Sequence, residues 1–248
     1  MMDLEKIRKN ILGELYYFES VGSTNREALE NGNAPNVSLF IAENQTDGRG
    51  RLGRSWEASE GGIYMTVLIK PDRLSANIPL LALMAGLCVS RIIPKSRIKW
   101  PNDIILDGKK VAGILAETRI LGKSAVIAVG IGINANNTAF SENLAEKATS
   151  IYLFSGKKQD KAELITGVYN ELIKLYKDFD KGFSALYGEY REKCITLNRE
   201  IAVIKDGTEC IMTAKDIGEN GELIAEADGK TERIAFGEVS VRGLLGYV

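Results

Sequence analysis

A loop in which three arginines alternate with glycines restricts the fold of this chain more than any other feature. It runs from Gly48 to Arg54 (GRGRLGR) and follows the apolar segment 38–42. Glycine permits close backbone approach, and arginine supplies a planar charge that matches carboxylate and phosphate oxygens, so the loop predicts an anion site. The heptad also fits the pattern G-x-G-x-x-G, but dinucleotide binding needs a tight turn from a strand into a helix. Here residues 54–57 run on to Gly61-Gly62, which disfavours a dinucleotide fold and leaves a solvated basic loop as the alternative.

Composition limits the chemistry that this chain can perform. Its 248 residues are 45% hydrophobic and 26% charged with a net charge of −1, so the loop arginines form a local positive site on a near-neutral body. Nucleic-acid binders usually carry a broader basic surface. The chain has no histidine, which excludes His-dependent triads and His-ligated zinc and favours catalysis by positioning and charge, as in nucleotidyl transfer. No signal segment or membrane-length apolar run is visible, so we expect a cytoplasmic protein, with its three scattered cysteines reduced in the core.

The spacing of apolar residues predicts alternating strands and helices. Thr24 and Glu27 fit a capping box that opens a short helix closed by Gly32, and Asp107-Gly108 fits a type I′ hairpin turn. Further helices are predicted at 78–93, 160–181 and 182–194, and strands at 14–20, 38–43, 62–70, 97–100, 104–106, 110–117 and 125–133. From Thr196 onward, short strands broken by Asp-Gly and Asn-Gly turns predict a small β-barrel or sandwich of its own.

Five short motifs, in a fixed order, resemble the catalytic region of the biotin protein ligases over roughly residues 17–136. They are Ser23-Thr24-Asn25, the loop 45–54, Lys99-Trp100-Pro101-Asn102-Asp103, residues 110–115 (KVAGIL) and residues 130–134 (GIGIN). The resemblance implies an α+β fold in residues 1–194, with a mixed sheet flanked by helices. It also implies that residues 195–248 form a small C-terminal Src-homology-3-like β-barrel.

The resemblance further implies that the protein activates biotin with ATP to biotinyl-5′-AMP and transfers biotin to a lysine of a carrier domain. Hydroxyl and amide groups would suit the neutral ureido ring, and arginines would offset the repulsion between carboxylate and α-phosphate. Without the resemblance, Thr24 could equally serve only as a helix cap, and Gly113 could serve only to let the strand pack. The biotin-binding residues implied are Ser23, Thr24, Asn25, Gln45, Arg49, Gly50, Arg51, Lys110 and Gly113.

A second set of residues is implied for ATP. Trp56 would stack on the adenine, and Lys110, Arg49 and Arg51 would act catalytically at the carboxylate and phosphate. A core role for Trp56 and a turn role for Asn102 remain open. The full ATP-binding set implied is Gly48, Arg49, Arg51, Arg54, Trp56, Asn102, Lys110, Asn134 and Arg242.

The resemblance also implies cofactors and partners. Mg²⁺ is expected to accompany ATP, but its ligands cannot be identified from sequence, and Asp103 fits either a magnesium shell or a turn. The expected partner is a biotin carboxyl carrier domain of a carboxylase or decarboxylase, with no DNA and no membrane, and a homodimer is left open. Two departures stand out, because Leu52 replaces an arginine common in relatives, and the residues before Ser23 are too few for a helix-turn-helix domain. We therefore expect the form that lacks the N-terminal DNA-binding domain.

Two other interpretations compete with this one. A lipoate–protein ligase would share the fold and the adenylation chemistry, although the Gly/Arg loop and the Lys-Trp-Pro-Asn-Asp motif favour biotin. A non-catalytic module could instead hold a nucleotide or RNA on the arginine loop, but the near-zero net charge disfavours it.

Overall fold

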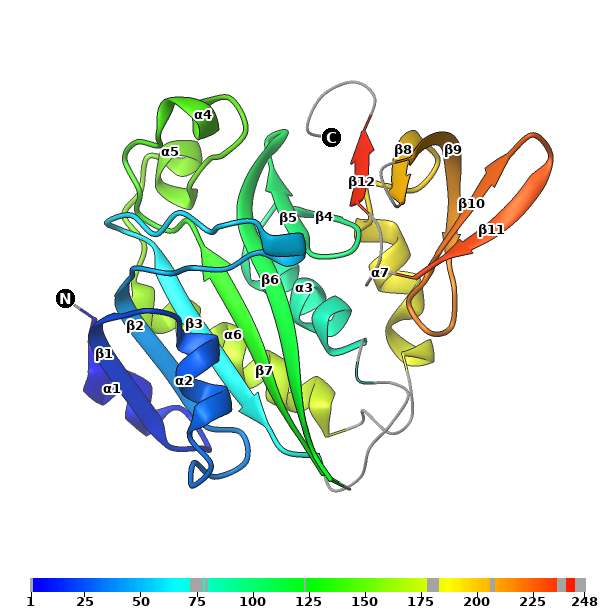
Figure 1. Ribbon diagram of the computed structural model, residues 1–248. Helices are drawn as coiled ribbons and strands as arrows, with labels where there is room; N and C mark the ends of the chain where they lie inside the picture. The colour runs from blue at the N-terminus through cyan, green and yellow to red at the C-terminus, as the bar shows by residue number, and fades with distance from the viewer. Residues whose placement is uncertain are drawn as a thin grey trace.

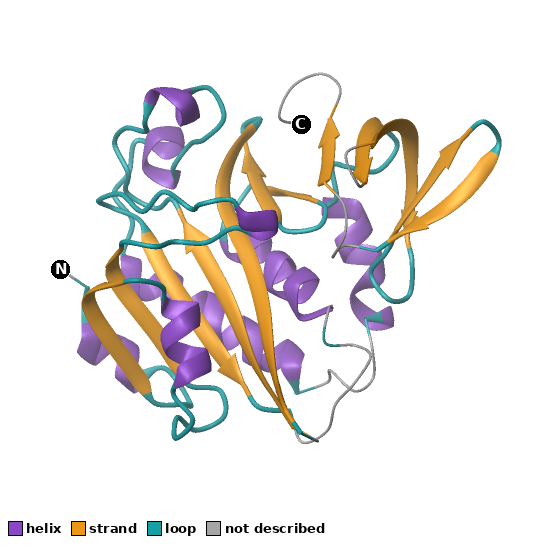
Figure 2. Cartoon of the chain, in the orientation of Figure 1, coloured by secondary structure: helices purple, strands orange, loops and turns teal. Residues whose placement is uncertain are grey.

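A computed structural model describes residues 2–71, 78, 80–122, 124–177, 183–205, 208–235 and 240–243 (Figure 1). It shows a seven-stranded mixed sheet flanked by helices and a second, five-stranded sheet near the C-terminus (Figure 2). Within those residues, no helix combines the length and apolarity needed to cross a membrane. The predicted α+β class with two sheets is therefore confirmed.

The large sheet has the order β1-β2-β3-β7-β6-β5-β4. Only β1 and β2 pair in parallel, and every other neighbouring pair in this sheet is antiparallel. Asp107 and Gly108 both have positive φ at the tip of the β5–β6 hairpin, as a type I′ turn requires. The strands are β1 (Leu15–Val21), β2 (Leu39–Gln45), β3 (Ile63–Ile69), β4 (Arg97–Lys99), β5 (Asp103–Leu106), β6 (Lys109–Leu121) and β7 (Ser124–Ile133).

Helices cover the two faces of this sheet unequally. On one face α3 (Leu80–Ile92) packs against α6 (Lys161–Tyr176) and the sheet, with α1 (Leu4–Lys9) against α6. Eleven consecutive residues of α3 are buried, as its apolar sequence predicts. On the opposite face α2 (Thr24–Glu30) covers β2, β3 and β7 (Figure 1), and leaves the rest of that face for a site. The remaining helices are α4 (Glu142–Ala145), α5 (Ile151–Ser155) and α7 (Tyr187–Lys193), and 3₁₀ turns lie at Arg51–Gly53 and Ser184–Leu186.

Strand alternation separates core residues from site residues, because successive side chains point to opposite faces of a sheet. In β7, Ile127, Val129, Ile131 and Ile133 join the large core cluster under α3 and α6. The alternating β7 positions facing α2 become progressively smaller, from Val126 and Ala128 to glycines at 130 and 132. This small-residue stretch makes room for side chains that approach the sheet from the α2 side.

The C-terminal strands form an antiparallel sheet with the order β11-β10-β9-β8-β12, so the predicted small β-region is confirmed, but its described strands do not close into a barrel. In the part of the chain that the structure describes, β11 and β12 lie at opposite edges and do not pair, and β10 joins β11 to β9 (Figure 1). The Asp206-Gly207 turn lies outside the described residues. The strands are β8 (Glu200–Lys205), β9 (Thr208–Ile217), β10 (Leu223–Ala227), β11 (Lys230–Ile234) and β12 (Ser240–Gly243).

Trp100 connects the two sheets. It is 1% exposed, its indole N–H donates to the Gly221 carbonyl at 2.9 Å, and its backbone N–H donates to Thr196 Oγ1 at 2.9 Å. Next to it, the Ile195 N–H donates to the Ile98 carbonyl and Cys194 forms a parallel bridge with Ile98. The division into residues 1–194 and 195–248 stays a prediction, and these contacts show that the chain is closely packed at that point.

Two local predictions are wrong. Cys88 and Cys194 are buried as expected, but Cys210 is exposed on β9. The helix predicted over 182–194 is divided between a 3₁₀ turn and α7, and its first residue lies outside the described part of the chain.

Candidate functional site

A cavity of about 270 Å³ lies on the face of the large sheet that carries α2. Thirteen of the fifteen residues predicted for biotin or ATP line it: Ser23, Thr24, Asn25, Gln45, Arg49, Gly50, Arg51, Arg54, Trp56, Asn102, Lys110, Gly113 and Asn134. The structure thus brings together five motifs that are spread over more than a hundred residues of sequence.

The Gly/Arg loop crosses this face as an ordered hairpin-like turn. The Trp56 N–H donates to the Gly48 carbonyl at 2.8 Å, and the Gly50 N–H donates to the Arg54 carbonyl at 2.7 Å. The loop tip is the 3₁₀ turn Arg51–Gly53, in which exposed Leu52 takes a left-handed conformation with φ 56°. The next element after the loop is the strand β3 and not an α-helix, in line with the poor fit to a dinucleotide motif.

One end of the cavity is built from neutral polar groups. Thr24 donates its backbone N–H to Gln45 Oε1 at 2.8 Å, and its hydroxyl lies 3.0 Å from the same oxygen. Ser23, not Thr24, is the N-cap residue of α2, and its side chain makes no capping hydrogen bond. The capping-box prediction is therefore wrong, because Gln45 takes the Thr24 N–H and places this hydroxyl in the cavity wall instead of at the helix end.

Asn25 at this end is fully engaged by three neighbours, two of which the sequence motifs did not include. Its amide nitrogen donates to Glu117 Oε2 at 2.7 Å and to the Leu115 carbonyl at 3.1 Å, while Thr66 Oγ1 lies 2.7 Å from its amide oxygen. Thr66 and Glu117 were missed because neither belongs to a motif. The period of two along β6, from Gly113 through Leu115 to Glu117, is the sequence signal that places Glu117 on the site face.

The other end of the cavity concentrates positive charge. Lys110 Nζ lies 2.6 Å from Asp103 Oδ1, and Arg51 donates to Asn102 Oδ1 at 3.3 Å. Burial lowers the pKa of the Arg51 guanidinium, which the charge of Asp103 partly opposes. The cavity lining holds six basic side chains, Arg49, Arg51, Arg54, Lys99, Lys110 and Lys147, against two acidic ones, Glu57 and Asp103. This excess suits a ligand that carries several negative charges.

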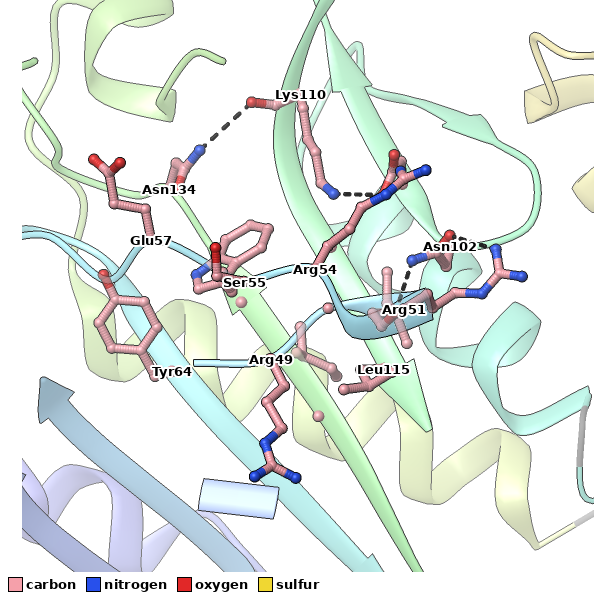
Figure 3. A pocket seen from close by; sticks show the side chains of 18 of the residues that line it. Arg49, Arg51, Arg54, Ser55, Glu57, Tyr64, Asn102, Lys110, Leu115 and Asn134 are labelled. Atoms are coloured by element: carbon pink, nitrogen blue, oxygen red, sulfur yellow. Dashed lines mark hydrogen bonds and ion pairs between the residues drawn. The ribbon is translucent and has the colours of Figure 1, made fainter. Parts of the chain in front are cut away.

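The three predicted catalytic cations do not all converge. Lys110 and Arg51 share the neighbourhood of Asp103, whereas Arg49 is directed to the other side of the loop (Figure 3). There Arg49 lies 3.1 Å from Asp47, which also pairs with Arg26 at 3.2 Å. Arg49 would have to leave Asp47 to contact a ligand beside Lys110.

Trp56 lies over a floor made of glycines. A Cβ built on Gly132 would come within 2.6 Å of the Trp56 ring, and one on Gly113 within 2.8 Å. Lys110 Nζ sits 5.2 Å from the Trp56 ring centroid, within cation–π range. The Trp56 indole nitrogen is buried, and none of the described residues offers it a hydrogen-bond partner. Trp56 is half-buried in the cavity wall rather than in the core, and Gly113 and Gly132 make room for its ring as well as for strand packing.

A segment around α4, residues 140–149, lines the cavity next to Trp56 and Asn134. Asn134 is 6% exposed and donates to the Thr149 carbonyl at 3.0 Å, which ties β7 to this segment. Ser141 donates to Glu57 at 2.7 Å, which fixes the segment to the end of the Gly/Arg loop. The segment adds four lining residues that no sequence motif indicated, Phe140, Leu144, Lys147 and Ala148.

Two predicted residues lie elsewhere. Gly48 lines the adjoining hollow beneath the loop, between the loop and residues 114–118. Arg242 lies on β12, paired with Ala202 of β8, and its side chain is outside the described part of the structure. Trp100 reaches the cavity wall, but its hydrogen bonds go to the C-terminal sheet.

Comparisons with known proteins agree with this geometry. Residues 17–134 match the model of the Biotin/lipoate A/B protein ligase family. The Bifunctional ligase/repressor BirA of Bacillus spizizenii is 36% identical over 185 residues, which cover 70% of this chain and 57% of that protein. The Escherichia coli protein of the same name is 30% identical over 248 residues, covering 94% of this chain and 77% of its own length. This chain therefore spans a little over half the length of its Bacillus relatives and most of the Escherichia coli one.

The solved structures include a similar protein with ligands bound. The biotin protein ligase of Aquifex aeolicus in complex with biotin and ATP superposes with a TM-score of 0.80 at 29% identity, covering 94% of this chain and all of that one. This chain thus shares sequence similarity with the Escherichia coli protein, and its architecture with the Aquifex aeolicus protein, over nearly its whole length. The chain belongs to the Biotin/lipoate A/B protein ligase family.

Proposed function

We propose that this protein is an ATP-dependent biotin protein ligase. The observation that carries the proposal is the continuous cavity with a neutral hydrogen-bonding end and a strongly cationic end. The neutral end, around Ser23, Thr24 and Gln45, suits the ureido ring of biotin, whose carbonyl accepts and whose N–H groups donate. The cationic end, around Arg51 and Lys110, suits the biotin carboxylate together with the phosphates of ATP.

In the first step a biotin carboxylate oxygen attacks the α-phosphorus of ATP, and the bond to pyrophosphate breaks. Two unit charges about 4 Å apart repel by roughly 4 kcal/mol at an effective dielectric constant of 20, so the reactants need counter-charge to meet. Lys110 and Arg51 supply it, and Lys110 exchanges its Asp103 partner for the ligand anions. Trp56 offers an aromatic ring beside Lys110 for the adenine.

In the second step the amine of a carrier lysine attacks the acyl carbon of biotinyl-5′-AMP and AMP leaves. The product is an amide, and the proton released from the amine passes to solvent or to the departing phosphate. We propose that the acceptor is the carrier domain of a biotin-dependent carboxylase or decarboxylase. The similarity to proteins of Mycobacterium tuberculosis and Paracoccus denitrificans named Biotin--[acetyl-CoA-carboxylase] ligase supports a carboxylase acceptor.

Magnesium enters this proposal as part of the ATP substrate. The described residues contain no group of three or more His, Cys, Asp or Glu side chains placed to hold a metal ion. Asp103, the carboxylate closest to Lys110, is paired with that lysine. Mg²⁺ is commonly held by substrate phosphates with only one or two carboxylates, so a phosphate-bound ion needs no dedicated protein cage.

The neutral end of the cavity also bears on the lipoate alternative. A dithiolane ring has no N–H donor and no carbonyl acceptor, so it would leave the buried hydroxyl of Thr24 and the half-buried amide of Gln45 without ligand partners. Unpaired buried polar groups reject an analogue more strongly than a missing methylene does. Biotin is therefore the better fit.

The test uses the full chain with ATP, magnesium and either biotin or lipoate. Pyrophosphate release with biotin and no carrier is expected, followed by a mass increase of one biotinyl group on a carrier domain. Ligand-dependent pyrophosphate release only with lipoate would assign the lipoate reaction instead. ATP binding without turnover of either acid would make the protein a binding module and overturn the proposal.

A further inference from the structure

A chain of buried polar side chains runs from Glu117 to the cavity wall at Thr24. Its members are Glu117 on β6, Asn25 and Thr24 on α2, and Thr66 on β3, and we call it the polar chain. Three of the four are at most 4% exposed, and Thr66 is fully buried. The polar chain therefore joins two strands and a helix beneath the neutral end of the cavity.

The donor and acceptor directions in the polar chain are fixed from the Glu117 end. Asn25 faces two groups that can only accept, the Glu117 carboxylate at 2.7 Å and the Leu115 carbonyl at 3.1 Å, so it must present its NH₂ to them. Its amide oxygen is thereby turned to Thr66, 2.7 Å away. An amide oxygen carries no hydrogen, so this short contact requires the single hydroxyl hydrogen of Thr66.

The same reasoning fixes the hydrogen-bond direction at the Thr24 hydroxyl. Because the Thr66 hydrogen is committed to Asn25, Thr66 can only accept across its 2.8 Å contact with the Thr24 hydroxyl. The other neighbour of that hydroxyl, Gln45 Oε1 at 3.0 Å, is also an acceptor. The Thr24 hydrogen therefore goes to Thr66 or Gln45 in every consistent arrangement. Only the lone pairs of Thr24 are left for a ligand.

We infer that the polar chain makes Thr24 an obligate acceptor and thereby selects a ligand with an N–H donor at this position. This inference rests on the proposed function, in which biotin occupies the cavity and one ureido N–H meets Thr24. Glu117 and Thr66 are positioning residues in this scheme, because they act on the ligand only through Asn25 and Thr24. Thr24 contacts the ligand, but its discrimination against rings without an N–H donor then depends on Thr66 and Glu117, which do not line this cavity.

Isosteric ligands and paired variants test the inference without catalysis. The ligands are biotin and the two cyclic carbamates in which one or the other ureido N–H is replaced by oxygen, each titrated by calorimetry without ATP. An oxygen facing the Thr24 lone pairs is repelled, so the wild-type protein should bind one carbamate at least 50-fold more weakly than biotin. Thr66→Val removes one of the two acceptors that hold the Thr24 hydrogen and leaves only Gln45, which already accepts the Thr24 backbone N–H, so the hydroxyl turns toward a ligand more readily and this ratio should fall at least fivefold. Glu117→Leu should also lower this ratio of affinities.

Conservative variants separate this role from packing. Thr66→Ser keeps the hydroxyl and Glu117→Gln keeps an acceptor oxygen, so both should retain the wild-type ratio. Thr208→Val and Glu209→Leu make the same chemical changes at exposed positions on β9 and should leave all three affinities unchanged. A wild-type protein that binds biotin and both carbamates equally would overturn the inference, as would an unchanged ratio in Thr66→Val. A wild-type protein that does not bind biotin would overturn the proposed function as well.

Discussion

Replacing Gly132 by alanine should weaken ATP binding while leaving biotin binding and the fold intact. The new Cβ would lie 2.6 Å from Trp56 Cε2 and 2.8 Å from Cζ2. Carbon atoms pack at about 3.5–4.0 Å, so the indole ring has to move by roughly 1 Å or rotate off the sheet. Alanine itself suits the strand, because Gly132 has no positive φ and its strand neighbours are regularly paired.

The expected size follows from the role proposed for Trp56. Stacking of a base on an aromatic ring is worth ~1–3 kcal/mol, so losing it should raise the KM for ATP by about 5- to 150-fold. The assay is pyrophosphate release with saturating biotin and varied ATP, with biotin affinity measured separately by calorimetry. On a Trp56→Ala background the Gly132 change should have almost no further effect, since the two act through one ring.

A matched control is available at Gly188 on α7, where an added Cβ meets nothing within 4 Å. Gly188→Ala should leave the KM for ATP unchanged and stabilise the helix by ~0.5–1 kcal/mol. An unchanged KM for ATP in folded Gly132→Ala protein would refute the reasoning. So would an equal loss of biotin affinity, because the ring would then not be specific to the nucleotide.

Four further changes have defined outcomes. Arg51→Ala should cost ~2–5 kcal/mol in adenylate formation, because a charge-assisted contact to a buried anion is lost, and single-turnover kinetics would measure it. Lys110→Ala should slow adenylation far more than Lys109→Ala, whose amine donates to the Ala145 carbonyl outside the cavity, and equal losses would contradict the assignment. Trp100→Phe should lower the unfolding free energy by ~1–3 kcal/mol in urea titrations, because the Gly221 carbonyl loses its buried donor. Hydrogen bonds from Arg91 lower the pKa of Glu189, so their stabilisation is present above the unfolded value of about 4.3 and is lost as the pH falls through the folded value. Glu189→Gln should accordingly be less stable than wild type at pH 7, with the difference closing below about pH 4 in pH-dependent unfolding.

Local signals in the sequence predicted most elements of the fold. The apolar run at 78–93 became the buried helix α3, and Asp107-Gly108 took two positive φ angles at a hairpin tip. These features depend on residues only a few positions apart, where periodicity and turn preferences act. The order of the strands, with β7 between β3 and β6, depends on pairings between distant segments and has no local signal.

The sequence therefore determined most of the strands and the longer helices, and thirteen of the fifteen site residues implied by the family resemblance line the cavity. The tertiary structure decided which partners those residues contact. Thr24 has the sequence of a helix cap, yet Gln45, 21 positions away, takes its N–H. Asn25 meets Glu117 across 92 positions, and Trp100 faces Gly221 across 121. A hydrogen bond over such separations exists only when strand register and sheet order bring the partners together, and neither is encoded in the short-range pattern of the chain.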